Sequence, residues 1–294
     1  DAPSGSPFIL ETNPDEKNLI TRVELDSLLG DNRYKGYKIF PNESVKIKQY
    51  QDNVEFAGMV ESIDESLGRI MKKLMELELD QNTIIIFYSD NGGMSAANFY
   101  YPDREISKKK LNTAFSTSNL PLRGGKGWMY EGGIRVPLII KWPGKGMQGI
   151  KSNVPVTSPD FFPTIIEMIG IQALNNDQRD GKSIVPLLMG EKVLDREAIY
   201  WHFPHYSNHG NQSPGGAIRN GDYKLLEYYE NNTVQLFNLV KDPGEQNDLS
   251  LVEPEKVKKL QAMLNNWRKK VKAKSMLPNS EYDSNALILS LIHI

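Results

Sequence analysis

The stretch Thr83-Ile-Ile-Ile-Phe-Tyr-Ser-Asp-Asn-Gly-Gly93 joins a continuous β-branched and aromatic run to a polar end that contains two glycines. The run from Thr83 to Tyr88 has no polar alternation, which predicts a strand buried on both faces inside a parallel sheet. In open α/β sheets, ligands bind in the crevice beyond the carboxyl ends of the strands. We therefore expect Ser89, Asp90 and Asn91 to emerge at the functional edge of the sheet.

Asp90 and Asn91 place a carboxylate beside an amide carbonyl, and both are hard oxygen donors of the kind that Ca²⁺ and Mg²⁺ prefer. A calcium ion takes about six to eight oxygen ligands, so the other ligands of such a site have to come from elsewhere in the fold. The alternative is an Asx turn, because Asp-Asn-Gly-Gly is also ordinary turn sequence. Taken alone, the motif favours the turn.

A second unusual stretch follows, Leu120-Pro-Leu-Arg-Gly-Gly-Lys-Gly-Trp-Met-Tyr-Glu-Gly-Gly-Ile-Arg-Val-Pro-Leu-Ile-Ile-Lys-Trp-Pro-Gly144, and it sets Lys126 among glycines. Glycine lets the backbone approach a ligand closely, and an ammonium is a compact point charge that suits an oxyanion such as sulfate or phosphate. The stretch is not a P-loop, because Gly127 stands where GxxxxGK[ST] requires Ser or Thr. Lys126 is therefore a candidate anion-binding residue.

The rest of this stretch has structural interpretations. Glu131 and Arg135 flank two glycines, and the simplest interpretation is an ion pair that fixes the turn. Val136 to Trp142 then predicts another buried strand.

The two stretches together carry a family resemblance that neither carries alone. Ser-Asp-Asn-Gly-Gly at 89–93, followed by Leu-Arg-Gly-Gly-Lys-Gly-x-x-Tyr-Glu-Gly-Gly-Ile-Arg-Val-Pro at 122–137, resembles the second half of the sulfatases of the alkaline-phosphatase superfamily. The resemblance implies an α/β fold: a mostly parallel sheet sandwiched by helices, here truncated, followed by a small antiparallel sheet and a C-terminal helix. It also implies that Asp90 and Asn91 are calcium ligands and that Lys126 is catalytic and contacts the substrate sulfate.

The nucleophile of that family is a formylglycine made from Cys or Ser in a Cys/Ser-x-Pro/Ala-x-Arg motif, which this sequence does not contain. We therefore expect a front-truncated sulfatase whose formylglycine lies in a missing front half. The intact enzyme would be a calcium-dependent sulfuric ester hydrolase, periplasmic or secreted, acting on a sulfated small molecule or polysaccharide, in particular a sulfated carbohydrate. This chain alone would be inactive, with an incomplete site for one calcium ion.

Two other functions stay open. A phosphodiesterase or phosphonate hydrolase of the same superfamily shares the calcium-binding edge, and a noncatalytic glycan-binding relative would keep the fold without the chemistry. The upstream sequence discriminates among them, because a Cys/Ser-x-Pro/Ala-x-Arg motif there supports a sulfatase, whereas Thr or another residue favours the others.

Composition bounds the remaining possibilities. A chain of 294 residues with 39% hydrophobic content can bury a sizeable core. A net charge of −2 gives no general attraction to nucleic acid or to an acidic membrane, and no apolar run approaches the ~18 residues of a membrane span. We therefore expect neither a nucleic-acid partner nor a membrane span. The absence of cysteine excludes disulfides and thiolate metal sites.

Residues 1–41 are rich in turn-forming residues and predict irregular structure with a short helix around Thr21–Leu29. Apolar residues then recur at spacings of three and four from Ser44 to Leu79, which predicts a long amphipathic helix packed on the sheet. A polar loop is expected over 100–119, with a solvated lysine triplet at 108–110.

The C-terminal half divides into recognisable parts. Ser158-Pro159 predicts a helix start, and Phe161 to Ile169 supplies the buried face of that helix. We assign 1–190 to the α/β catalytic domain and 191–284 to a C-terminal subdomain. We expect 285–294 to be a non-native tail, because its last residues, Leu-Ser-Leu-Ile-His-Ile, resemble a translated sequencing adapter.

The C-terminal subdomain is predicted as a four-stranded antiparallel sheet with a helix. Its hairpin turns are expected at Asn220-Gly221 and Asn231-Asn232. A basic amphipathic helix follows over Pro254–Ser275, with Val257, Leu260, Leu264, Trp267 and Val271 inward. The strands are expected at Ala198–Phe203, Gly216–Arg219, Tyr223–Tyr229 and Val234–Val240.

Three of the four histidines, His202, His205 and His209, lie close together in the sequence. A zinc site is the least favoured interpretation, because Pro204 breaks helical spacing and neither a carboxylate nor a cysteine joins the cluster. Structural histidines and substrate-pocket contacts are favoured equally. In related polysaccharide sulfatases, this segment resembles the part that reaches back toward the pocket. On that resemblance, His205 and then His202 are candidate substrate-binding residues.

Overall fold

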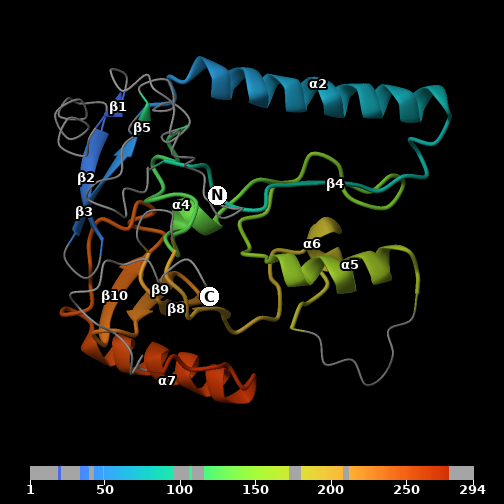
Figure 1. Ribbon diagram of the computed structural model, residues 1–294. Helices are drawn as coiled ribbons and strands as arrows, with labels where there is room; N and C mark the ends of the chain where they lie inside the picture. Colours follow the sequence, from blue (N-terminus) through green and yellow to red (C-terminus); the bar gives the residue numbers. More distant parts are fainter. Residues whose placement is uncertain are drawn as a thin grey trace. The chain divides into compact units, whose positions relative to one another are not determined.

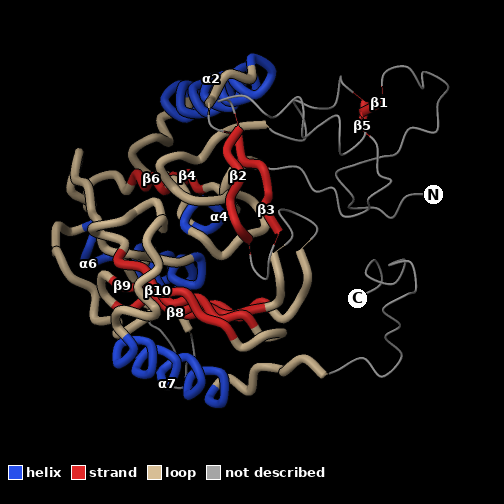
Figure 2. The backbone as a smooth tube through the Cα atoms, turned by 90° about the vertical axis from the view of Figure 1, so that its left-hand side faces the viewer, coloured by secondary structure: helices blue, strands red, loops and turns tan. Residues whose placement is uncertain are grey.

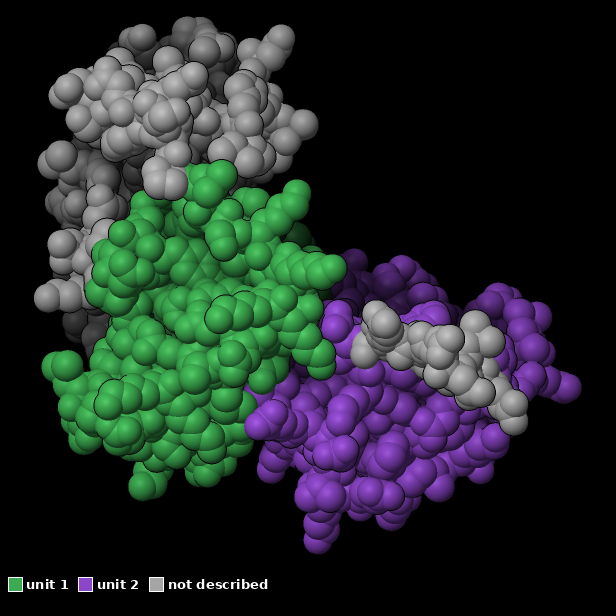
Figure 3. Space-filling view, turned by 90° about the horizontal axis from the view of Figure 1, so that it is seen from below, with its two compact units in different colours: residues 1–60, 89–136, 200–294 green, residues 61–88, 137–199 purple. Residues whose placement is uncertain are grey.

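Figure 1 shows a computed structural model of the chain. The chain divides into two compact units, coloured separately in Figure 3. One unit comprises residues 1–60, 89–136 and 200–294, and the other comprises 61–88 and 137–199. The residues that the structure describes are 19–20, 34–39, 43–48, 50–95, 106–107, 116–171, 180–207 and 212–277.

Strand β4 (Ile85–Tyr88) is where the sequence predicts a strand, but its pairing differs from the prediction. It pairs antiparallel with β6 (Leu138–Lys141), in a register that sets Tyr88 opposite Leu138. Both strands are only partly buried, and Ile139 is 64% exposed. The prediction of two buried strands in a parallel arrangement is therefore wrong for this pair. An apolar run favours extended backbone but carries no information on the direction of its partner.

Helix α2 (Val54–Glu76) confirms a long helix in this part of the chain, but not its start or its packing. Residues Glu43–Lys48 form strand β3, paired antiparallel with β2 (Tyr34–Ile39), so the predicted helix start at Ser44 is wrong. The helix begins after Asn53, whose Oδ1 accepts the N–H of Phe56 at 3.1 Å as an N-cap.

No residue of α2 is buried, so the predicted packing of this helix on the sheet is also wrong. Val60, Ile63 and Ile70 of its apolar stripe are each more than half exposed. The periodicity that predicts an amphipathic helix does not determine what covers the apolar face.

A four-stranded sheet with strand order β10-β9-β8-β7 confirms the predicted C-terminal sheet. Strand β9 pairs antiparallel with both β8 and β10. Helix α7 (Pro254–Lys270) contacts β8 and β9 and lies along the sheet in both backbone views (Figures 1 and 2). Leu260 and Leu264 of α7 are fully buried, whereas Trp267 is half-buried and stacks on Tyr200, with ring centroids 5.0 Å apart. Val271, predicted to point inward, is 41% exposed. The strands are Ile199–Phe203 (β7), Gly215–Asn220 (β8), Tyr223–Tyr228 (β9) and Thr233–Asn238 (β10).

The hairpins occur where the sequence predicts them, with shifted loops. Asn220 is the last residue of β8 and pairs with Tyr223, so the first loop is residues 221–222, not Asn220-Gly221. Gly221 adopts a φ of 58°, a conformation in which glycine has no steric penalty. The second loop spans 229–232 and contains Asn232 at a φ of 54°.

The second unit contains a buried carboxylate that accepts several hydrogen bonds, that of Asp160, which is 0% exposed. We call Asp160 and its partners the buried node. A 3₁₀ turn over Ser158–Asp160 leads into α5 (Phe161–Met168), which confirms the helix predicted to start at Ser158. The Asp160 carboxylate accepts the backbone N–H of Thr157 at 2.7 Å and of Lys182 at 2.9 Å, and both of its oxygens pair with Arg196. Asp160 therefore joins α5 to the segment that leads into α6 (Val185–Leu188).

Several expectations lie outside the described residues: the helix around Thr21–Leu29, the lysine triplet at 108–110, His209 and the tail at 285–294. Within the predicted loop 100–119, β5 (Ile106–Ser107) pairs antiparallel with β1 (Leu19–Ile20). Across the described part of the chain, no helix combines the length and apolar character needed to cross a membrane.

Candidate active site

Residues 89–93 and 120–136, which carry the sequence motifs, lie side by side in the first unit. The N–H of Gly92 donates to the carbonyl of Gly133 at 3.0 Å, and the N–H of Lys126 donates to the carbonyl of Gly93 at 3.1 Å. The Asp90-Asn91 turn is therefore tied through its own glycines to the loop that carries Lys126.

Asn119 strengthens this connection, and the sequence gives no signal for it. Its Oδ1 accepts the N–H of Gly93 at 3.0 Å, and its Nδ2 donates to the carbonyls of Gly93 at 2.8 Å and Gly124 at 3.1 Å. One amide side chain thus satisfies three backbone groups from both stretches. Such a contact leaves no sequence pattern, because an asparagine in a polar loop is ordinary.

The glycines of the motif are required because the backbones approach closely. A Cβ at Gly92 would lie 1.7 Å from the carbonyl oxygen of Gly132, and a Cβ at Gly133 would lie 2.1 Å from the carbonyl oxygen of Trp128. No side chain fits at either distance, so Gly92 sets the packing of one stretch against the other, and Gly133 allows the second stretch to fold closely on itself.

We expect Gly92→Ala to lower the free energy of unfolding by at least about 1–3 kcal/mol, because overpacking forces two backbone segments apart. Gly58→Ala is the matched control in the same unit, since Gly58 lies in helix α2 and a Cβ added there would have no atom within 4 Å. Alanine there should be neutral or stabilising by up to ~1 kcal/mol. Urea unfolding of both variants checks this, and equal stabilities would contradict the assignment.

Asp90 is exposed and Asn91 is half-buried, in the turn directly after β4. The Asp90 Oδ1 accepts the N–H of the next residue, Asn91, at 2.9 Å, and Ser89 Oγ donates to the Asn91 carbonyl at 3.0 Å, so both contacts are local to the turn. The turn and the metal interpretation are compatible, because Oδ2 of Asp90 and the amide oxygen of Asn91 have no hydrogen bond within the described residues. These residues contain no group of three or more His, Cys, Asp or Glu side chains that could hold a metal ion by themselves.

Lys126 is half-buried in the glycine-rich loop. Among the described residues, no ion pair or hydrogen bond to its ammonium is present, and its backbone N–H alone holds it against Gly93. Gly124 and Gly127 on either side adopt φ angles of 74° and 94°, which favour glycine. The loop therefore presents an ammonium that the described protein does not neutralise.

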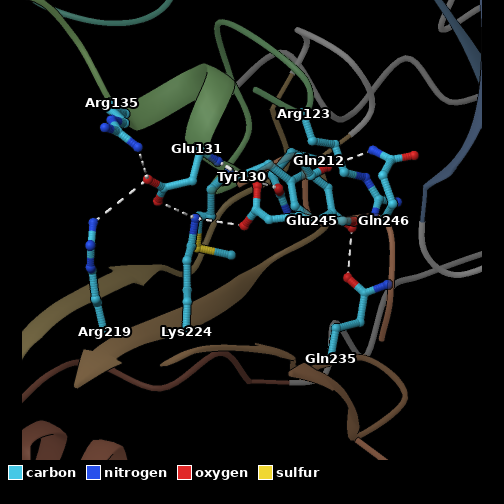
Figure 4. A network of polar contacts seen from close by, with 12 residues as sticks. Arg123, Tyr130, Glu131, Arg135, Gln212, Arg219, Lys224, Gln235, Glu245 and Gln246 are labelled. Atoms are coloured by element: carbon cyan, nitrogen blue, oxygen red, sulfur yellow. Dashed lines mark hydrogen bonds and ion pairs between the residues drawn. The ribbon is translucent and has the colours of Figure 1, made fainter. Parts of the chain in front are cut away.

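The expected ion pair between Glu131 and Arg135 is present at 3.9 Å, but it is a minor part of a larger buried cluster (Figure 4). Glu131 lies in the short helix α4 (Glu131–Ile134) and is 2% exposed. Its Oε1 lies 3.1 Å from Lys224 Nζ, which also lies 2.9 Å from Oε1 of Glu245. Arg219 approaches Glu131 at 3.7 Å.

Burial dominates the electrostatics of this cluster. It raises the pKa of the Glu245 carboxyl, against the opposing effect of the Lys224 ammonium. It also raises the pKa of the Tyr130 hydroxyl and, more strongly, that of the Tyr228 hydroxyl, so both phenols stay protonated. Tyr228 donates to the Tyr130 oxygen at 3.1 Å, and Tyr130 donates to Gln235 Oε1 at 2.6 Å. The loop is thus joined to the C-terminal sheet by buried polar groups.

The two described candidate histidines differ in their surroundings. His202 in β7 has Nδ1 2.6 Å from the Tyr229 hydroxyl and Nε2 2.8 Å from the carbonyl of Lys274, so both ring nitrogens contact protein groups. This geometry favours the structural alternative for His202. His205 is exposed, and its ring meets the ring of Phe203 edge-on at 5.7 Å.

Comparison with known families gives two overlapping matches. Residues 17–171 match the family model described as "Sulfatase", and residues 125–274 match the one described as "N-sulphoglucosamine sulphohydrolase, C-terminal". The first match includes both the Asp90-Asn91 turn and the Lys126 loop, and the second covers the C-terminal sheet and α7.

Individual proteins give the same result. A protein named "Sulfatase" from Formosa agariphila is 35% identical over 218 residues, which are 68% of this chain and 36% of the relative. A solved structure of BT4656 with its substrate D-glucosamine-2-N,6-O-disulfate is 27% identical, with a TM-score of 0.55 over 72% of this chain and 39% of that one. A structure of Ps i-CgsB with k-i-k-neocarrahexaose is also 27% identical, with a TM-score of 0.58 over 74% of this chain and 44% of that one.

The chain thus spans less than half the length of each of these proteins. The α/β fold class expected from the sequence, with an antiparallel sheet and helix at the C-terminal end, is confirmed by these structural neighbours.

Proposed function

The chain belongs to the sulfatase family of the alkaline-phosphatase superfamily, and from that membership we propose that the protein it forms part of is a sulfuric ester hydrolase. One observation carries the proposal. The two motifs, distant in sequence, meet through the bonds from Gly92 to Gly133 and from Lys126 to Gly93. A carboxylate, an amide oxygen and an ammonium therefore come from adjoining loops of one compact unit.

Lys126 has the role of stabilising the transferring sulfate. An ammonium fixed in a glycine-rich loop can donate hydrogen bonds to sulfate oxygens and offset the negative charge that develops on them in the transition state. Its lack of any carboxylate partner within the described residues supports this role, because a lysine committed to a structural ion pair would not be available to substrate.

Asp90 and Asn91 are proposed as two ligands of a calcium ion. The donor set fits, since Asp90 is exposed with one carboxylate oxygen that has no protein donor in the described residues, and the next residue, Asn91, carries an amide oxygen. When bound, calcium supplies electrostatic stabilisation of sulfate and nucleophile oxygens. The other ligands and the formylglycine nucleophile are proposed to lie in sequence outside this chain, which is consistent with the coverage of less than half of each compared protein.

We expect Asp90→Ala in the full-length protein to weaken calcium binding by at least about tenfold, because a hard-cation site with few carboxylates tolerates the loss of one poorly. Asp64→Ala is the control, since Asp64 is an exposed acid on α2. Calcium titration by calorimetry checks the difference. Equal calcium affinity in the two variants would show that Asp90 forms only a turn.

The substrate is proposed to be a sulfated carbohydrate. Two structural neighbours are described in complex with a sulfated glucosamine and with a carrageenan-type oligosaccharide, and both are 27% identical to this chain. His205, exposed beyond the end of β7, is the proposed contact to the sugar, whereas His202 has both ring nitrogens engaged by the protein.

An assay with a chromogenic aryl sulfate tests the proposed reaction directly. The full-length protein should release the phenol in the presence of calcium and lose this activity when a chelator removes the metal. An aryl phosphonate and a phosphodiester serve as competing substrates. Preferential turnover of either one would replace the sulfatase assignment with a phosphonate hydrolase or phosphodiesterase, and turnover of none would favour a glycan-binding protein.

A further inference from the structure

The loop that carries Lys126 is closed at its base. The N–H of Gly132 donates to the carbonyl of Arg123 at 2.8 Å, so residues 123–132 form a loop whose two ends are hydrogen-bonded to each other. Lys126 lies inside this loop. Whatever holds the two ends therefore sets the position from which the Lys126 side chain extends.

Both ends of the loop are attached to one residue of the C-terminal part, Glu245. At one end, Nη1 of Arg123 donates to the Glu245 carbonyl at 2.8 Å. At the other, the N–H of Glu131 donates to Oε2 of Glu245 at 2.7 Å. Glu245 is 0% exposed and adopts a φ of 50°, which costs a side-chain-bearing residue free energy unless its surroundings hold it there.

Lys224 of β9 holds this arrangement together (Figure 4). Its ammonium lies between the carboxylates of Glu131 and Glu245, at 3.1 and 2.9 Å, and the three side chains are 0–3% exposed. We call these three residues the buried clamp. A lysine in a strand would ordinarily expose its charge to water, so the complete burial of Lys224 needs an explanation.

Stability alone does not explain the buried clamp. Removing charges from water is costly, and apolar residues of similar volume often stabilise a fold as well or better. A buried ammonium instead fixes the positions of two carboxylates at once, because moving it away from either one would leave a buried charge without its partner. Arg123 adds a second constraint, since its guanidinium carbon lies 4.1 Å from the centre of the Tyr130 ring.

We propose that the buried clamp positions the Lys126 loop, with Lys224 as the positioning residue that acts through Glu131 and Glu245. Lys224 itself does not touch the substrate. The positioning of the loop does not depend on the proposed function. Its consequence for catalysis does rest on that function, because it requires Lys126 to be the residue that contacts the sulfate.

Hydrogen exchange on the 294-residue chain tests the positioning without any need for turnover. Lys224→Met removes the ammonium with little change in length, and Lys258→Met is the control, since Lys258 forms only an exposed pair with Glu255. The readout is the exchange of amides in 123–133 relative to those in β10. In Lys224→Met, we expect the exchange of the loop amides to accelerate at least about tenfold more than that of the β10 amides, because the loop can then open locally while the sheet stays folded.

Equal acceleration in the loop and in β10 would overturn the proposal, because it would mean that Lys224 contributes only global stability. Glu131→Gln is the second variant and decides the question if Lys224→Met does not fold. It leaves Lys224 paired with Glu245 and keeps the backbone bond from residue 131 to Glu245, but it removes the negative charge that draws the Lys224 ammonium to the loop, so it should give the same loop-selective acceleration. Unchanged exchange in Glu131→Gln would also overturn the proposal.

Kinetics of the full-length protein test the link to catalysis separately. Glu131→Gln should lower kcat for an aryl sulfate at least about tenfold with little change in KM, since a displaced Lys126 loses transition-state contact. Loop-selective exchange with an unchanged kcat would refute the catalytic link alone. Full activity in Lys126→Ala would instead refute the proposed role of Lys126 and leave the exchange result intact.

Discussion

Lys126→Ala in the full-length protein should lower kcat for an aryl sulfate by roughly 10² or more, while KM changes much less. The physical reason is that, in the proposed role, the ammonium of this half-buried loop contacts sulfate oxygens whose negative charge grows as the S–O bond breaks, so its effect should be larger in the transition state than in substrate binding. A loss of roughly 10² in kcat corresponds to about 2.7 kcal/mol of transition-state stabilisation.

The control for this experiment is Lys258→Ala, because Lys258 is an exposed lysine of α7 whose side chain is 72% exposed. It should leave kcat unchanged. Lys126→Arg keeps the charge but not the shape, and it should recover part of the activity at most. If Lys126→Ala retains the wild-type kcat and only melts at a lower temperature, the lysine is structural and the assignment is wrong.

Asp160→Ala should lower the free energy of unfolding of the chain by about 3–5 kcal/mol. The Asp160 carboxylate is fully buried and accepts two backbone N–H groups and the guanidinium of Arg196, whose side chain is 12% exposed. Removing it leaves a largely buried cation without its partner and two donors without an acceptor, and each is costly in a site that water does not reach.

Asp195→Ala is the matched control, because the Asp195 side chain is fully exposed and pairs with Lys182 at 3.4 Å on the surface. Exposed ion pairs contribute little, so this variant should stay within about 1 kcal/mol of the wild type. Urea unfolding followed by circular dichroism measures both variants. Similar small losses in the two would show that the buried node at Asp160 is not needed to hold α5 in place.

Sequence periodicity predicted the C-terminal sheet and α7 well, because hairpin contacts are local. Strand β9 pairs with β8 and β10, its neighbours in the chain, and alternation together with turn residues therefore determines most of the arrangement. The one-residue shift of the loop at Gly221 shows the limit of this reasoning. The dipeptide Asn-Gly marks a turn, but the register depends on which pairs the strands form.

Periodicity predicted α2 and β4 less well, because their surroundings are not local. The spacing of apolar residues in α2 predicts a helix, yet it does not show that the helix begins at Val54 after an N-cap. The apolar run in β4 predicts a strand, yet not that β6 runs antiparallel beside it. The partner of β4 is distant in the sequence, whereas the start of α2 is set by the local N-cap at Asn53, which the spacing of apolar residues does not reveal.

The sequence by itself determined the family, and the resemblance of its two motifs to that family identified Asp90, Asn91 and Lys126 as candidate site residues. Only the tertiary structure showed what holds those residues in place: Asn119 between the stretches, and the buried clamp of Glu131, Lys224 and Glu245 under the Lys126 loop. The reason is physical. In a sequence, a lysine in a strand and a glutamate in a turn read as solvated surface charges, and only folding shows that distant charges meet and leave water together.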